Sequence, residues 1–417
     1  MKKMIVGLLC VMLGLGTVSG CGSSKPEPEQ SQDETAAEDT EKEDDTQMNT
    51  QTDAQETDSG TEQTEEQEKN SDDSLQTEEE EKEEQGEDEE KDMAQDMTMS
   101  VLKEEAGTHD YTSLEELNPE PGTRVAVVVK NTKTAYWAAV KQGMEAAVSA
   151  INEKMGYKGD DKVTLSFEGP SDDMDVEKQI DLIDAVLSEN PEVLCIAAID
   201  MQSCEAQLEM ARENDIPVIM LDSAVESGPV SAVCSTDNYG AGVEAAKRLA
   251  EAIEDQGEVA VMAHAASSKN SQEREKGFTD EIANNHPNIR IVNISHENED
   301  FTMAKMADAV FTLYPDVEGY FCTNEQASNA VLEAVEAAGK DIKIVGFDSG
   351  KQQQAAVKSG KEVGFITQNP YGMGYATVVA GLRADLGLEI DSFINTSFQW
   401  IDSENLEDET YSSFLYE

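Results

Sequence analysis

From residue 122 onward, short apolar runs alternate with stretches whose apolar residues recur at helical spacing. Residues 124–130 (RVAVVVK) form a β-branched run of the buried-strand type, and residues 136–152 then carry apolar side chains on one helical face. The same alternation continues along the chain. Further strands are expected at 162–169, 193–199, 217–222, 231–236, 258–263, 289–295, 317–323, 342–348 and 362–368. Further helices are expected at 176–188, 205–214, 242–252, 272–284, 303–313, 326–338, 352–359 and 371–386.

Strands that are apolar on both faces and alternate with helices are typical of α/β proteins with parallel sheets covered by helices. Because crossover connections are nearly always right-handed, each half of this region should form one doubly wound, Rossmann-like sheet. The first half ends near Thr236, and Asp237 is a candidate N-cap for the helix that opens the second half. We therefore predict two lobes with a cleft between them.

Residues 22 to about 118 contrast with this region, because they have almost no apolar periodicity. Between residues 22 and 120 there are 37 acidic residues against six lysines, which accounts for over half of the net charge of −58. Such a segment cannot bury enough apolar surface to offset its conformational entropy, so we expect it to be disordered. It would serve as a self-repelling tether or, alternatively, as an acidic arm that binds cations or a partner. The acidity argues against nucleic acid as a partner.

The first 21 residues have the features of an export signal. A positive segment at residues 1–3 precedes about 15 apolar residues, which are too few for a transmembrane helix and suit a signal peptide. The segment ends in Val18-Ser19-Gly20-Cys21, which resembles the lipobox of bacterial lipoproteins, although Val18 replaces the commoner leucine. The resemblance implies cleavage before Cys21 and a lipid on its thiol, which would anchor the chain to a membrane without spanning it. An ordinary secretory cleavage near Gly20 is the alternative.

Polar or aromatic residues stand at or near the carboxyl ends of several expected strands, before the next helix. They are Arg274, Phe301, Asn324, Asp348 and Gln368. In open parallel α/β sheets, ligands bind in the crevice outside the carboxyl ends of the strands, so these side chains should converge on one cleft. An arginine, an acid, two amides and a ring are groups that bind a neutral polyhydroxyl molecule. We interpret the cleft as a sugar-binding site.

Fingerprints of common enzymes are missing from the sequence. No Gly-x-Gly-x-x-Gly follows the first strand, and neither a P-loop nor a Gly-x-Ser-x-Gly elbow occurs. His264 ends a strand at the expected cleft, and we interpret it as an ordinary loop residue, with a ligand contact or general base as the alternative. We therefore expect no catalysis and no cofactor.

The cysteines give no sign of a metal site. Cys195, Cys204, Cys234 and Cys322 lack the spacing of metal ligands, and most of them lie in apolar strands. We expect free buried thiols, with a disulfide between Cys195 and Cys234 or a similar pair as the alternative.

Seven short pieces of sequence occur in a recognisable order and spacing. They are Ala135-Tyr136-Trp137 with the helical residues that follow as far as Gly143, residues 216–222 (IPVIMLD), 235–242 (STDNYGAG), 273–278 (EREKGF), 323–325 (TNE), 345–348 (VGFD) and 366–368 (ITQ). Each piece is weak alone, but together they are specific. By these pieces, residues from about 123 to 417 resemble the type I periplasmic sugar-binding proteins, the ribose-binding-protein-like solute receptors of ABC transporters.

The resemblance implies two Rossmann-like lobes that are linked by three crossing strands and close on a sugar. Tyr136 and Trp137 would then stack on the sugar ring, and Phe301 would contribute from the second lobe. The residues implied to hydrogen-bond the hydroxyl groups are Asp222, Arg274, Asn324, Asp348 and Gln368.

Some of these residues have structural alternatives. Tyr136 and Trp137 also suit core positions of the first helix, Asp222 suits a turn, and Asp348 suits a helix cap. Arg274 has the clearest functional signal, because we place it in the first turn of its helix, where a cation is mildly unfavourable.

Two departures from the family pattern lie in the first lobe. Ser223 follows Asp222 where many pentose and hexose binders carry an arginine, and Lys133-Thr134 stands where asparagine is common. We include Thr134 and Ser223 in the expected site, and the departures leave the identity of the sugar open. Lys130 and Lys133 make an acidic or phosphorylated ligand the alternative to a neutral sugar.

The resemblance implies a monomeric, extracellular, lipid-anchored receptor that captures a monosaccharide and delivers it to an ABC permease. The expected organisation is a signal peptide at 1–20, the lipidated Cys21 and a disordered linker at 21–120, a first lobe at 121–236 plus 369–395, and a second lobe at 237–368 plus 396–417.

The sequence also allows functions other than transport. A sensory receptor would present a sugar or a furanosyl signal to a membrane kinase or chemoreceptor. An exported sugar enzyme would need an acid/base pair in the cleft, for which Asp222 and Asp348 are the candidates. A sugar-responsive repressor is disfavoured, because the N-terminal segment reads as an export signal and an acidic tail where a helix-turn-helix would be needed.

Overall fold

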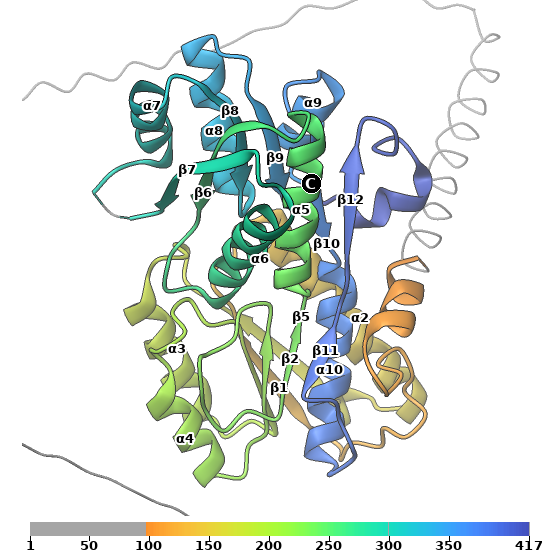
Figure 1. Ribbon diagram of the computed structural model, residues 1–417. Helices are drawn as coiled ribbons and strands as arrows, with labels where there is room; N and C mark the ends of the chain where they lie inside the picture. The colour runs from red at the N-terminus through yellow and green to blue at the C-terminus, as the bar shows by residue number, and fades with distance from the viewer. Residues whose placement is uncertain (1–96, 299, 417) are drawn as a thin grey trace, which may run out of the picture. The chain divides into compact units, whose positions relative to one another are not determined.

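The computed structural model describes residues 97–298 and 300–416. The expected signal peptide, Cys21 and most of the acidic linker lie outside the described residues. Within the described part of the chain, no helix combines the length and the apolar character needed to cross a membrane. Two six-stranded sheets organise this part, one in each lobe (Figure 1).

The first lobe is built on a sheet with the strand order β11-β5-β4-β3-β1-β2, in which every neighbouring pair is parallel. Its strands are β1 (Arg124–Val128), β2 (Thr164–Glu168), β3 (Val193–Ile196), β4 (Val218–Leu221), β5 (Ala232–Ser235) and β11 (Phe393–Asn395). The central strands β3 and β4 are buried throughout, as expected of a parallel sheet with helices on both faces.

The second lobe repeats this arrangement with the order β12-β10-β9-β8-β6-β7. Its strands are β6 (Gly257–Ala263), β7 (Ile289–His296), β8 (Val317–Cys322), β9 (Lys343–Phe347), β10 (Gly364–Gln368) and β12 (Phe398–Asp402). Only the β10–β12 pair of this sheet is antiparallel. The two orders correspond position by position, so β4 is equivalent to β9 and β5 to β10.

Helices cover both faces of each sheet, which confirms the predicted α/β fold with two doubly wound lobes. They are α2 (Ala135–Met155), α3 (Val176–Ser188), α4 (Glu205–Glu213), α5 (Asn238–Ala252), α6 (Lys269–Asn285), α7 (Met303–Leu313), α8 (Glu325–Ala338), α9 (Lys351–Lys358) and α10 (Pro370–Asp385), with 3-10 turns η1 (Gly159–Asp161) and η2 (Glu409–Phe414). In the first lobe α2 and α10 share one apolar core, and α3 and α4 share the other. In the second lobe α5 and α6 pack on one face, and α7 and α8 pack on the opposite face.

Glycines set the close approach of α5 and α6. A Cβ atom at Gly242 would lie 2.1 Å from the carbonyl oxygen of Arg274, and one at Gly277 would lie equally close to the backbone of α5. Only glycine allows two helix backbones to approach in this way. The helix α6, which carries Arg274, is thereby held in one position against α5.

The chain crosses between the lobes three times. The crossings lie between β5 and α5, between β10 and α10, and between β11 and β12. This confirms the three-segment hinge that the resemblance implied.

Residues 97–121 form a strap that packs against the first lobe, which corrects the predicted disorder up to residue 120. Residues 97–105 are helical, and Leu102, Tyr111 and Leu117 are fully buried in the core of α2 and α10. Figure 1 shows the strap in orange beside these helices. The prediction was wrong here because the strap follows a long acidic run and has few apolar residues, although Met99, Leu102 and Ala106 have helical spacing.

The strap is also bonded to two of the three crossing segments. The side-chain amide of Asn369, which follows β10, donates to the carbonyl oxygen of Thr98 at 2.9 Å. The backbone N–H of Asn395, at the end of β11, donates to the carbonyl oxygen of Ala106 at 3.2 Å. The strap therefore contacts both the core of the first lobe and the hinge.

Candidate functional site

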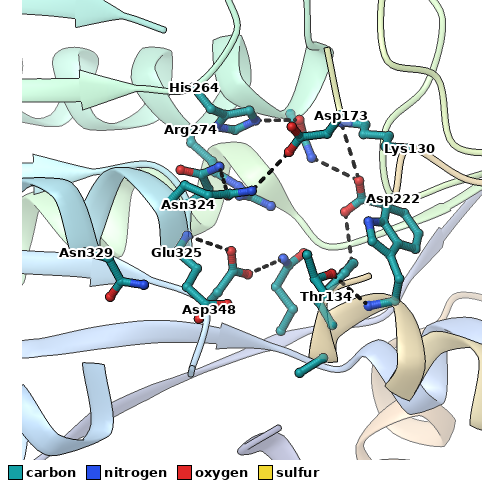
Figure 2. Close-up of a pocket in the computed structure, with 16 residues that line it drawn as sticks. Lys130, Thr134, Asp173, Asp222, His264, Arg274, Asn324, Glu325, Asn329 and Asp348 are labelled. Atoms are coloured by element: carbon teal, nitrogen blue, oxygen red, sulfur yellow. Dashed lines mark hydrogen bonds and ion pairs between the residues drawn. The ribbon is translucent and has the colours of Figure 1, made fainter. Parts of the chain in front are cut away.

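A pocket with a volume of about 310 Å³ lies between the lobes and is lined by residues of both. Its lining includes most of the expected site residues, which are Thr134, Tyr136, Trp137, Asp222, Arg274, Asn324, Asp348 and Gln368. Figure 2 shows Lys130, Thr134 and Asp222 of the first lobe on one side and Arg274, Asn324 and Asp348 of the second lobe on the other. Its volume falls at the small end of the range for ligand pockets, and its place at the carboxyl ends of the strands is the usual one for this class of fold.

Arg274 lies in the second turn of α6 and not in the first, as expected, because the helix begins three residues earlier than predicted, at Lys269. Its side chain is buried to 2% exposure. Its Nε donates to the side-chain oxygen of Asn238 at 2.8 Å, and its Nη1 donates to the carbonyl oxygen of Thr323 at 2.7 Å. The guanidinium group stacks 3.6 Å from the centre of the Phe347 ring. Its Nη2 has no partner among the described residues. The side chain is therefore fixed in place, and its Nη2 group keeps N–H donors for a ligand.

Asp348 follows β9 and is held by three donors. The Gln368 side-chain amide donates to Oδ1 at 2.8 Å, the Tyr416 hydroxyl donates to the same oxygen at 2.9 Å, and the backbone N–H of Glu325 donates to Oδ2 at 3.1 Å. Gln368 in turn accepts from the hydroxyl of Thr236 at 2.9 Å. Burial and the charge of Asp348 raise the pKa of Glu325. The carboxylate is thus oriented before any ligand arrives.

Asp222 follows β4 in the first lobe. The hydroxyl of Tyr136 donates to its Oδ1 at 2.9 Å, and the side-chain amide of Asn270 donates to Oδ2 at 3.2 Å. Burial and the neighbouring Asp222 raise the pKa of Tyr136 well above its usual range, so this phenol stays protonated and acts as a donor.

Lys130 adds a second buried cation to the pocket. Its ammonium group donates to the hydroxyl of Ser268 at 3.0 Å and lies 3.7 Å from Asp222 Oδ2. Burial lowers the pKa of Lys130, and the Asp222 carboxylate opposes that shift.

His264 directly follows β6 and lines the pocket. Its Nδ1 lies 2.8 Å from the hydroxyl of Thr323, and its Nε2 lies 3.1 Å from the side-chain oxygen of Asn270. Burial, together with the positive charges of Arg274 and Lys130, holds the pKa of His264 well below its usual range. The imidazole is therefore neutral at pH 7 and can both donate and accept hydrogen bonds.

A periplasmic binding protein domain is the family whose sequence model matches residues 125–385, which is more than half of the chain. The chain belongs to the type I periplasmic sugar-binding proteins. The ribose import binding protein RbsB of Bacillus subtilis (strain 168) is 26% identical to this periplasmic binding protein over 249 residues, which cover 59% of this chain and 76% of the relative.

Two solved structures support the same family. An ABC transporter solute-binding protein from Agrobacterium vitis, bound with alpha-D-tagatopyranose, is 28% identical with a TM-score of 0.65 and covers 71% of this chain and 99% of its own. Another from the same organism, with bound D-fucose, is 26% identical with a TM-score of 0.63 and covers 70% of this chain and 100% of its own. The relatives are transport binding proteins, and this periplasmic binding protein is accordingly not an enzyme.

The two lobes of this periplasmic binding protein touch around the pocket. Besides the contacts of Lys130 with Ser268 and of Asp222 with Asn270, the side-chain amide of Gln326 donates to Asp173 at 3.0 Å. These bonds join residues of opposite lobes, so the structure is a closed form of the hinge. A ligand in the pocket would be enclosed by both lobes.

The aromatic residues expected to stack on a ring are both at the pocket. Tyr136 and Trp137 are 9% and 6% exposed, line the pocket from the start of α2, and meet edge to face with ring centres 5.0 Å apart. Both also belong to the core of the first lobe, which was the alternative role for these two residues. Thr134 is the N-cap of α2, because its hydroxyl accepts from the N–H of Trp137.

Two expected residues do not line the pocket. Phe301 is 60% exposed in the loop before α7, and Ser223 is buried beside the pocket with its hydroxyl 3.3 Å from that of Ser268. Phe301 was misplaced because the chain continues beyond β7 into a loop that carries the ring to the surface. The four cysteines of the described part are free and buried.

Sequence reasoning missed several residues that line the pocket, namely Asp173, Asn270, Glu325, Gln326 and Asn329. Asp173 and Gln326 meet only because the lobes close, and no local pattern signals such a pair. Asn270 lies in the first turn of α6 and Asn329 in the second turn of α8, and neither belongs to a motif on which the resemblance rests. Glu325 directly follows Asn324 and could have been found from the Thr-Asn-Glu motif.

Proposed function

We propose that the chain captures a neutral monosaccharide between its two lobes and delivers it to an ABC permease at the outer face of the membrane. The observation that carries the proposal is the free Nη2 donor of Arg274, which is buried and already oriented by bonds to Asn238 and Thr323. A fixed arginine fork can bind two adjacent hydroxyl oxygens of a sugar.

The charges around the pocket favour a neutral sugar over an acidic one. Arg274 and Lys130 are faced by the carboxylates of Asp222 and Asp348, and Asp173 adds another carboxylate at the lining. A sugar phosphate would be repelled by these carboxylates, whereas hydroxyl groups can donate to them and accept from the cations. The relatives bound to tagatose and fucose support the same class of ligand.

A thermal-shift screen of the full chain tests this function. The panel contains pentoses and hexoses, including D-ribose, D-tagatose and D-fucose, together with disaccharides, sugar phosphates and nucleosides. A ligand at about a hundredfold excess over its Kd adds about 2.7 kcal/mol to the free energy of unfolding, which raises the melting temperature by several degrees. We expect one monosaccharide to do this. Shifts from sugar phosphates or nucleosides alone would overturn the proposed ligand class.

Arg274→Lys is the matched variant for the screen, because it keeps the charge but loses the planar fork. We expect it to lose the sugar-dependent shift, and its melting temperature without sugar reports any loss of stability.

We also propose that Cys21 carries the lipid anchor and that the acidic segment tethers the lobes to the membrane. Cys21→Ala should release the chain from the membrane fraction into the medium. Retention of this variant in the membrane fraction would contradict the anchor.

A further inference from the structure

Tyr416 lies between the two lobes, next to the pocket but outside its lining. Its side chain is 6% exposed and packs in the core of the first lobe. Its backbone N–H donates to the hydroxyl of Ser349 in the second lobe at 3.2 Å. The preceding turn is bonded to the same lobe, since the carbonyl oxygen of Phe414 accepts from the hydroxyls of Ser349 and Thr367. The segment is thus attached to one lobe and reaches into the other.

The hydroxyl and the ring of Tyr416 each contact a pocket residue. The hydroxyl donates to Asp348 Oδ1 at 2.9 Å, and the ring meets that of Tyr136 edge to face, with centres 5.6 Å apart at an interplanar angle of 70°. Tyr136 donates its own hydroxyl to Asp222 Oδ1 at 2.9 Å. Contacts therefore run from Asp348 through both tyrosines to Asp222, and they connect the two pocket carboxylates across the hinge.

We propose that Tyr416 is a positioning residue for the ligand, which sets the sugar affinity by holding Asp348 and Tyr136 in their binding orientations in the closed form. This inference rests on the proposed function, because it assigns Asp348 a direct contact with the sugar.

The geometry at Asp348 explains why the hydrogen bond from Tyr416 should affect ligand binding. Oδ1 receives donors from Tyr416 and Gln368, while Oδ2 receives only the backbone N–H of Glu325. A carboxylate oxygen accepts about two hydrogen bonds, so Oδ1 is saturated and Oδ2 keeps an acceptor site for a ligand hydroxyl. Without the Tyr416 hydroxyl, the carboxylate would have to be ordered on binding, which lowers affinity. Loss of the Tyr416 hydroxyl also frees Asp348 Oδ1 to accept a hydrogen bond from the ligand in place of Oδ2. This second way of binding would reduce selectivity among sugars.

Calorimetric titration of the full chain tests the proposal, with the monosaccharide that gives the largest melting shift in the panel as the probe. The variant is Tyr416→Phe, which keeps the ring and its contact with Tyr136 but removes the donor to Asp348. Loss of a hydrogen bond to a charged group should raise the Kd about tenfold or more. Tyr411→Phe is the matched control from the same segment, because its hydroxyl has no hydrogen bond among the described residues.

A double-mutant cycle separates this role from a general loss of packing. If Tyr416 acts through Asp348, Tyr416→Phe should weaken binding much less in an Asp348→Asn background than in the parent. Equal Kd values for the parent and Tyr416→Phe, or equal losses in both backgrounds, would overturn the proposal.

A crystal structure of unliganded Tyr416→Phe decides the matter even if no sugar binds. We expect the carboxylate of Asp348 to turn away from its position in the parent. An unmoved carboxylate would show that Tyr416 does not orient it. Failure of the parent to bind any sugar would instead count against the proposed function alone.

Discussion

Asp222 and Asp348 occupy equivalent positions in the two lobes. Each directly follows the third strand from the same end of its sheet, β4 in one lobe and β9 in the other. Each has a left-handed backbone, with φ of 55° and 71°, and each accepts a tyrosine hydroxyl at 2.9 Å. A left-handed turn at a non-glycine residue is sparsely populated and is often found at functional sites. The pocket is thus built from two matching halves, with one braced carboxylate from each lobe.

We expect Glu297 to make ligand affinity depend on pH. It follows β7 in the second lobe and shares a groove with Asp172, Asp175 and Glu177 of the first lobe. Burial, with the charges of Asp173 and Asp172, raises the pKa of Glu297 to about 7 from an ordinary value of 4.5. Opening of the lobes would separate these partners and lower the pKa of Glu297, so we expect closure on a ligand to take up a proton.

We therefore expect sugar affinity to fall as the pH rises from about 5 to about 8, by less than about tenfold per pH unit, the limit for one linked proton. Glu297→Gln should flatten this dependence, whereas Glu177→Gln, on the same groove, should keep it. Calorimetry at several pH values measures both. A parent affinity that is constant over this range would refute the linkage.

We expect Glu362 to make the stability of the second lobe depend on pH. It is 2% exposed, and its Oε1 accepts from the amide of Gln353 at 3.2 Å. Its Oε2 and the side-chain oxygen of Gln353 have no partner among the described residues. Burial raises the pKa of Glu362 to about 8 from an ordinary value of 4.5.

Because the folded protein keeps a proton that the unfolded chain releases, this group's contribution to stability is present below pH 4.5 and is lost as the pH rises to about 8. Glu362→Gln is neutral at every pH, so its melting temperature should fall less than that of the parent between about pH 6 and pH 9. The exposed Glu404→Gln serves as control. If the melting temperatures of the parent and Glu362→Gln changed equally with pH, the Glu362 carboxyl group would not be the source of the pH dependence.

The strap contributes to the stability of the first lobe. Leu102 is fully buried against the core of α2 and α10, so Leu102→Ala should lower the free energy of unfolding by about 2–5 kcal/mol. Glu104→Ala, on the exposed side of the same helix, should change it by less than about 0.5 kcal/mol. Urea denaturation measures both. If Leu102→Ala were as stable as Glu104→Ala, the strap would not be part of the folded lobe.

Local patterns were sufficient for most of the fold. The helices at Val176–Ser188 and Met303–Leu313 match their predicted bounds, because both follow a capping residue and have a regular apolar face. Strand ends then located Arg274, Asn324, Asp348 and Gln368 at the pocket. Family resemblance supplied Tyr136, Trp137 and Asp222.

The remaining features depend on contacts between distant parts of the chain. Tyr416 and Leu102 are buried by residues far away in sequence. The bond between Asp173 and Gln326 forms only across the closed hinge. Such contacts leave no local mark in the sequence, so only the folded structure reveals them.

The most direct test of the two-sided pocket is a calorimetric titration of the best sugar against the parent, Asp222→Asn and Asp348→Asn. Asparagine tolerates the left-handed backbone at both positions, so each variant removes the charge with little strain. We expect one sugar per chain and a Kd raised about 10- to 100-fold in each variant, since a hydrogen bond to a charged group contributes about 1.5–3 kcal/mol. Unchanged affinity in either variant would show that its carboxylate does not bind the sugar and would contradict this account.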